Sequence, residues 1–148
     1  MKIKFIESRQ VHGISVKTNN IDELDSTKAK IGRLHQQFDK QVTVNYVGGE
    51  CVYAIYYDYE SDASGVYSVM CGFDGDPKDI KSLTTLEIQT GKYLVFSATG
   101  KIPKIVIETW GEIWEYFSSE GCKYRRTYST DFEFYKGLNE VEIYIAIE

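Results

Sequence analysis

The sequence predicts an α+β protein made of two tandem β-α-β-β repeats, which pair about a pseudo-twofold axis into one antiparallel sheet with both helices on one face. Two observations favour this fold. Strand-like and helix-like segments follow the same order twice. Landmark residues also recur 79 positions apart: Phe38 and Phe117 (117 − 38 = 79), and Tyr53 and Phe132 (132 − 53 = 79). We expect a ligand cleft between the halves, because grooves of this kind usually hold ligands.

The first repeat, about residues 1–78, opens with an apolar and polar alternation over 2–17 that Gly13 interrupts. This pattern predicts one strand with a kink. Apolar residues then recur on one helical face, and Asn20 with Glu23 three residues later resembles a capping box. We therefore expect a helix over about 21–38.

Two strands complete the first repeat. Residues 51–59 are rich in β-branched and aromatic residues, and residues 66–73 share this composition. The polar segment 60–65 between them is typical of a turn.

The second repeat, about residues 79–148, follows the same order within a single domain of 148 residues. Residues 83–98 are strand-like around Gly91, and the segment from Pro103 to Phe117 has the broad apolar stripe of a helix. Residues 131–147 alternate in two runs around a short Gly-Leu-Asn turn, which predicts a closing hairpin.

Charge and cysteine content exclude several classes of function. The 17 basic and 22 acidic side chains give a formal charge of −5, which disfavours direct binding to nucleic acid. Cys51, Cys71 and Cys122 are widely spaced, so they indicate no metal site, and we expect no cofactor. The chain has neither the apolar region of a signal peptide nor an apolar run of 18 residues, so we expect no membrane association and a cytoplasmic protein.

The run from Asp131 to Ile147 contains a carboxylate, Glu133, between Phe132 and Phe134. A charge among aromatic residues costs several kcal/mol unless a partner stabilises it. The fold can supply that partner, with Arg125 or Arg126 as candidates, or a ligand can.

Four stretches in order, "IGRLHQQF", "VYAIYYDYESDASGVYSVMCGF", "GKYLVFSATGKIPKIVIETWGEIWEYF" and "RTYSTDFEFYKGLNEVEIYIAI", resemble one family. It is the effector-binding domain of AraC-type and MerR-type transcription regulators, also found alone in gyrase-inhibitory-like proteins. The chain is most similar to the stand-alone cationic-drug-binding proteins of integron cassettes, from about Ile6 to Ile147.

The resemblance implies a hydrophobic cleft that binds lipophilic organic cations through aromatic residues around one acid. It places that acid at Glu133. His35 stands where such relatives often carry Trp, which bears on the range of ligands. The aromatic residues that we expect around the ligand are Trp110, Tyr53, Tyr57, Tyr67, Phe96 and Tyr144.

Strand alternation indicates how this site is arranged. Phe132 and Phe134 share one face and Glu133 shares the other with Tyr135. We expect the phenylalanines to pack under the helices and Glu133 to face the cleft, where tyrosine hydroxyls hold it ionised. A carboxylate between apolar walls attracts a delocalised cation, and each aromatic face adds about 0.5 to 2 kcal/mol.

The leading hypothesis is therefore a binding protein for hydrophobic cations that acts as a sensor or sequesters its ligand. With both helices used by the repeats, any control of transcription would need a separate DNA-binding partner. One alternative is a small-molecule hydrolase with Glu133 as general base and Tyr67 or Tyr144 as the acid. Another is a protein that binds gyrase and inhibits it.

Overall fold

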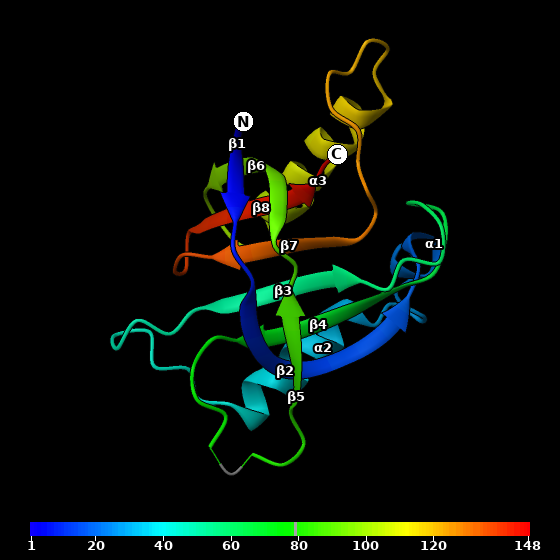
Figure 1. Cartoon of the computed structure of the whole chain (residues 1–148). Coiled ribbons are helices and arrows are strands. Elements are labelled where there is room, and N and C mark those ends of the chain that lie inside the picture. Colours follow the sequence, from blue (N-terminus) through cyan, green and yellow to red (C-terminus); the bar gives the residue numbers. More distant parts are fainter. Residues whose placement is uncertain (79) are drawn as a thin grey trace.

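A computed structural model of the protein describes residues 1–78 and 80–148, and it contains one eight-stranded antiparallel sheet in the order β1-β6-β8-β7-β3-β4-β2-β5 (Figure 1). The strands are β1 (Lys2–Ile6), β2 (Arg9–Thr18), β3 (Val52–Tyr57), β4 (Tyr67–Phe73), β5 (Thr84–Ile88), β6 (Gly91–Thr99), β7 (Thr130–Tyr135) and β8 (Glu140–Ala146). The helices are α1 (Asn20–Glu23), α2 (Ile31–Gln41) and α3 (Lys104–Ser118).

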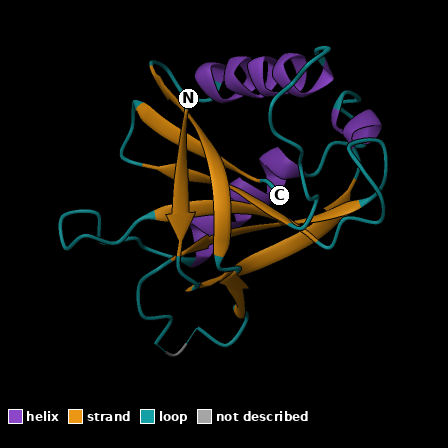
Figure 2. Ribbon diagram, turned by 45° about the horizontal axis from the view of Figure 1, so that its top comes forward, coloured by secondary structure: helices purple, strands orange, loops and turns teal. Residues whose placement is uncertain are grey.

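Apart from the short helix α1, the two halves of the chain have the same order of elements, and they meet at the central pair of strands, β3 and β7. In that pair Ala54 lies opposite Glu133, and 133 − 54 gives the offset of 79 expected from the sequence. The pseudo-twofold axis therefore passes through this pair. The predicted fold class is confirmed: the sheet is antiparallel and strongly curled, and α2 and α3 pack on the same face of it (Figure 2).

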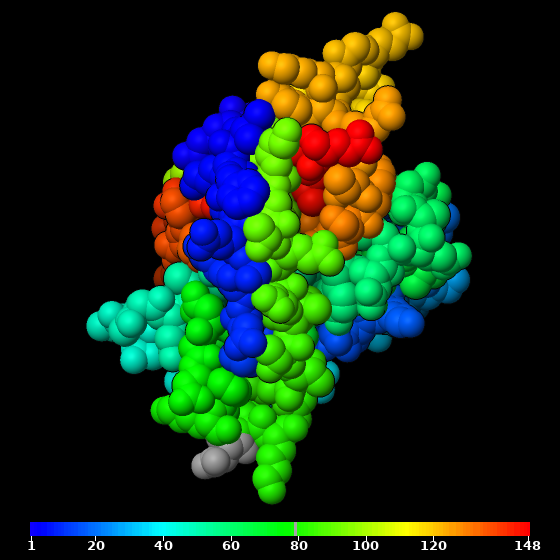
Figure 3. All heavy atoms as spheres, viewed as in Figure 1, coloured from blue at the N-terminus to red at the C-terminus, as the bar shows by residue number. Residues whose placement is uncertain are grey.

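The first strand of each half belongs to the sheet of the other half. β1 pairs with β6, and β5 pairs with β2, so the N-terminal segment, in blue, and the segment that contains β5 and β6, in green, lie side by side in Figure 3. The prediction of one strand over 2–17 was wrong, because the chain leaves the pairing with β6 after Ile6 and starts a new pairing at Arg9. The stretch 83–98 likewise forms two strands, separated at residues 89–90.

The single helix predicted over 21–38 is also interrupted. α1 ends at Glu23, and the Glu23 carboxylate accepts the backbone N–H of Ile31 at 3.1 Å, which satisfies a free donor at the start of α2. Asn19, rather than Asn20, caps α1 with its side chain. The apolar periodicity predicted the helical face correctly but gave no signal for the turn within it.

The sheet has an apolar core on each face. Leu34 and Phe38 of α2 and Ile113 of α3 cover one face. Phe132 and Phe134 lie on the opposite face, so the prediction that they pack under the helices was wrong. Alternation assigned the residues to two faces correctly, but it carries no information on which face the helices cover.

The boundary expected between the repeats, at residues 78 and 79, falls on Asp79, which lies outside the described residues. Across residues 1–78 and 80–148, no helix is long and apolar enough to cross a membrane. The same ranges contain no group of His, Cys, Asp and Glu side chains arranged to hold a metal ion.

Gly13 is a position at which the fold admits no side chain. It faces Gly72 on β4, and a Cβ there would lie 2.0 Å from the carbonyl oxygen of Cys71. We expect Gly13→Ala to lower the free energy of unfolding by about 1–3 kcal/mol, because the backbone of β4 must move. Urea unfolding followed by circular dichroism measures the change.

The matched control is Gly111→Ala in α3, where a Cβ meets nothing within 4 Å. This substitution should raise stability by about 0.5–1 kcal/mol, since Ala favours the helix. Equal effects of the two substitutions would contradict the close strand approach at Gly13.

Candidate functional site

Glu133 lies on the central strand β7 with only 2% of its surface exposed. Its Oε2 accepts hydrogen bonds from the Tyr56 hydroxyl and from Trp110 Nε1, both at 2.7 Å. Its Oε1 accepts a hydrogen bond from the Tyr135 hydroxyl. Three neutral donors, from β3, β7 and α3, thus hold one buried carboxylate.

No cation pairs with this carboxylate among the residues that the structure describes. The alternative that Arg126 compensates Glu133 is wrong, because Arg126 Nη2 lies 2.7 Å from Oδ2 of Asp131. Removing an ionised carboxylate from water costs several kcal/mol, and hydrogen bonds to a charged group return about 1.5–3 kcal/mol each. Glu133 therefore has three hydrogen-bond donors but no positively charged partner among the described residues.

The two tyrosines that bind Glu133 are related by the repeat. The difference 135 − 56 is again 79, so each half contributes the same hydroxyl, one to each carboxylate oxygen. The third donor breaks the symmetry, because the residue 79 positions before Trp110 is Ile31, which has no polar side-chain group. The site is thus built on the pseudo-twofold axis, and the acid and the Trp110 indole belong to the second half alone.

Aromatic rings continue outward from the carboxylate along the helix face. The ring of Trp110 lies 5.2 Å from that of Tyr56 and 6.2 Å from that of Trp114. On the other side, the rings of Tyr56 and Tyr67, and of Tyr67 and Tyr59, are each 5.8 Å apart. These rings form a wall of the kind that favours flat or cationic ligands.

His35 lies beside this wall, as its place in the resemblance suggested. Its ring centroid is 6.3 Å from that of Tyr135, and its Nδ1 is 3.3 Å from Sγ of the buried Cys71. The residue 79 positions later is Trp114, which is 47% exposed. The first half therefore presents a smaller, polar ring where the second half presents an indole.

Of the residues expected around the ligand, Trp110 and Tyr67 lie on the face of Glu133. Phe96 shares that face but packs under α3 against Tyr116 and Phe117. Three tyrosines lie on the opposite face, so the structure does not bring them to Glu133: Tyr53, Tyr57 and Tyr144.

The alternation within strands explains both the errors and the omissions. Tyr53 stands 79 residues before Phe132, so it shares the face of the phenylalanines rather than that of Glu133. Tyr56 was missed, although it lies two residues from Ala54, the repeat counterpart of Glu133, and so on the same face. The repeat offset combined with alternation would have identified it.

The carboxylate is closed off in this structure. Only 2% of Glu133 is exposed, and it lines neither the cavity of about 420 Å³ at the end of α3 nor the cavity of about 230 Å³ on the opposite face of the sheet. The Trp110 indole covers the position at which a ligand would meet Oε2. A ligand that reaches Glu133 must therefore displace this indole.

The buried carboxylate changes the acidity of its tyrosine donors. Burial, and then the negative charge of Glu133, raise the pKa of Tyr56 well above its ordinary value of 10.0. The same two causes raise the pKa of Tyr135. Both hydroxyls therefore stay protonated and remain donors throughout the neutral range.

The chain belongs to the Cass2 family of integron-associated effector binding proteins, whose profile matches residues 2–147. The resemblance found in the sequence is thereby confirmed.

Individual relatives agree with this assignment. Integron cassette protein VCH_CASS2, from the mobile metagenome of Vibrio cholerae, is 38% identical with a TM-score of 0.91, over 99% of this chain and 95% of that one. YobU of Bacillus subtilis (strain 168), described as a candidate transcriptional regulator, is 28% identical over 99% of this chain and 96% of YobU. SAV2435, solved bound to tetraphenylphosphonium, shares the fold at a TM-score of 0.68 and 18% identity, over 99% of this chain and 93% of that one.

The raised tyrosine pKa values predict how stability depends on alkaline pH. A group whose pKa is raised on folding contributes stability that is complete below its unfolded pKa, here 10.0, and is lost as the pH rises above it. Each buried tyrosine should lower the free energy of unfolding by about 1.4 kcal/mol per pH unit in that range. Urea unfolding at a series of pH values from about 9 to 11 measures this slope.

In Tyr56→Phe and Tyr135→Phe the slope above pH 10 should become shallower than in the wild type, because Phe does not titrate. Both variants should also lose stability at neutral pH by about 1–3 kcal/mol, since Glu133 loses a donor. Slopes that match the wild type in both variants would contradict the assigned hydrogen bonds.

Proposed function

We propose that the protein binds lipophilic organic cations and that Glu133 is their counter-ion. The observation that carries this proposal is a buried carboxylate bonded by three neutral donors, with no cation beside it among the described residues. Membership of an effector-binding family supports a small-molecule ligand. The cation bound by SAV2435, which shares the fold, supports the charge of that ligand.

The chemistry of the site favours a large, delocalised cation over a metal or ammonium ion. Such a cation loses little hydration on entry, and it gains Coulomb energy from Glu133 in a medium of low dielectric constant. The rings of Trp110, Tyr56 and Tyr67 add cation–π attraction of about 0.5 to 2 kcal/mol each once water is excluded.

Access to the site requires Trp110 to move. The indole N–H occupies Oε2 of Glu133, while the outer neighbour Trp114 is 47% exposed and has room to turn outward. We infer that the ligand replaces the Trp110 hydrogen bond with its own charge and that the displaced indole then packs on it. In the absence of ligand, the neutral Trp110 N–H would thus remain bonded to the Glu133 carboxylate.

This binding activity suits a sensor or a sequestering protein. The described helices are all parts of the effector-binding fold, so a role in transcription would depend on a DNA-binding partner. The hydrolase alternative is less well supported by the geometry. Tyr67 donates to Asn20 and Tyr144 donates to Glu142, so neither of the expected acids contacts Glu133.

Neutralising the acid tests the proposed function. Glu133→Gln should weaken binding of tetraphenylphosphonium by about 1–3 kcal/mol, because the charged partner of the cation is removed. Isothermal titration calorimetry measures the affinity, and analysis of the titrated compound for breakdown products would detect turnover.

Glu142→Gln is the matched control, since Glu142 is a buried carboxylate on the opposite face, bonded to Tyr144 and Lys136. It should change the affinity by less than about twofold. If Glu133→Gln binds the cation as tightly as the control does, Glu133 is not the counter-ion.

The covering role of the indole is tested separately with Trp110→Phe. This change keeps an aromatic ring but removes the N–H that competes for Glu133, so tetraphenylphosphonium should bind about fivefold more tightly or better. Trp114→Phe, which removes no bond to Glu133, should leave the affinity nearly unchanged. Weaker binding in Trp110→Phe than in Trp114→Phe would show that the indole contacts the ligand without closing the site.

A further inference from the structure

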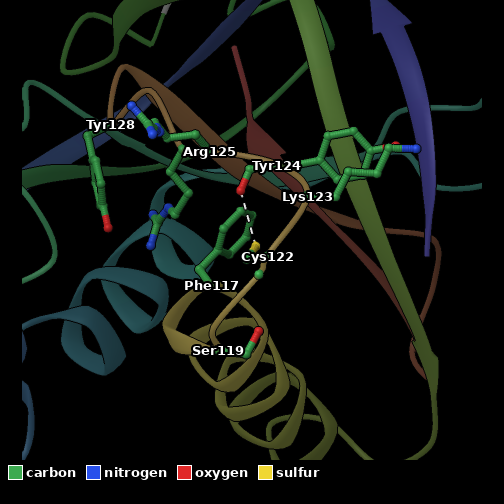
Figure 4. A pocket seen from close by; sticks show the side chains of 9 residues that line it. Phe117, Ser119, Cys122, Lys123, Tyr124, Arg125 and Tyr128 are labelled. Carbon is green, nitrogen blue, oxygen red and sulfur yellow. Dashed lines mark hydrogen bonds between the residues drawn. The ribbon is translucent and has the colours of Figure 1, made fainter.

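We propose that the protein carries a second ligand site, for an oxyanion attached to an aromatic body, in the cavity beside the C-terminal end of α3. This cavity has a volume of about 420 Å³, and its walls come from the end of α3 and from the segment 119–128 (Figure 4). Pockets for small molecules in proteins usually measure about 300–1,000 Å³. Glu133 is absent from its lining, so the inference does not rest on the proposed function.

The cavity is lined by positively charged side chains. Lys123, Arg125 and Arg126 line it, and no acidic residue of the described chain is among its lining residues. Arg126 is neutralised by Asp131, but neither Lys123 nor Arg125 has a carboxylate within 4.0 Å among residues 1–78 and 80–148. A protein with a formal charge of −5 thus concentrates two uncompensated cations at one cavity.

A buried guanidinium, that of Arg126, lies behind the wall of this cavity. The Arg126 side chain is 5% exposed, and its Nε has no hydrogen-bond partner in the described structure. Because this Nε is covered, we assign the direct contacts to Lys123 and Arg125, and to Arg126 a fixed positive charge behind them.

The rings around the cavity define the rest of the ligand. The Arg126 guanidinium lies 4.3 Å from the ring centroid of Tyr128 and 5.8 Å from that of Phe117. Both rings, together with that of Tyr124, belong to the cavity lining. Aromatic rings beside exposed cations, in an otherwise polar lining, match an aromatic carboxylate or an aryl phosphate better than a bare inorganic ion.

Titration of the full chain with 2-naphthoate and 2-naphthyl phosphate, followed by calorimetry and by the amide NMR signals of residues 119–128, tests this proposal. Both anions should bind, while the neutral isostere 2-naphthalenemethanol and inorganic phosphate should bind at least about tenfold more weakly. Arg125→Gln and Lys123→Gln should each lower the affinity for the anions by about threefold to tenfold.

Two controls separate this site from the rest of the surface. Lys28→Gln removes an exposed cation elsewhere, and Glu133→Gln alters the other site, so both should leave the naphthoate affinity unchanged. The proposal is overturned if neither anion binds, if Arg125→Gln and Lys123→Gln bind as the wild type does, or if the neutral isostere binds equally well. Because tetraphenylphosphonium is not used, these outcomes are independent of the result at Glu133.

Discussion

The buried carboxylate of Glu133 is the constraint around which the centre of this protein is organised. A charge with 2% exposure on the middle strand of a sheet would destabilise the fold by several kcal/mol if it had no donors. The Glu133 carboxylate accepts hydrogen bonds from one tyrosine hydroxyl of each half and from an indole N–H of α3. These donors tie β3, β7 and α3 together at the point where the two halves join, so the same contacts stabilise the fold and prepare the site.

The duplication explains why the acid occurs in one half only. Ala54 and Glu133 lie directly opposite each other on neighbouring strands, where Cβ atoms are about 5 Å apart. A second carboxylate at position 54 would place like charges face to face inside the protein, which is strongly unfavourable. A small residue there instead leaves room for the acid and its donors. A symmetric repeat thus yields a single, asymmetric site on its own axis.

A comparison of two carboxylates on β7 shows what distinguishes a candidate site from a structural contact. Asp131 is fully buried and accepts bonds from Arg126, from the Tyr59 hydroxyl and from the backbone N–H of Ala146, so its charge is balanced within the fold. Glu133, two residues later, has only neutral donors. The described residues thus supply a positive charge for Asp131 but none for Glu133.

The sequence by itself determined the fold class, the duplication and the presence of an acid in an aromatic-rich strand at Glu133, because periodicity, a fixed offset and a charge among aromatic residues are local patterns. It also separated the two faces of β7. Only the tertiary structure decided that α2 and α3 cover the face of Glu133, that β1 and β5 exchange halves, and that Arg126 pairs with Asp131. These outcomes depend on how segments distant in the chain pair and on which face the helices pack, and neither is encoded in the spacing of residues along one strand.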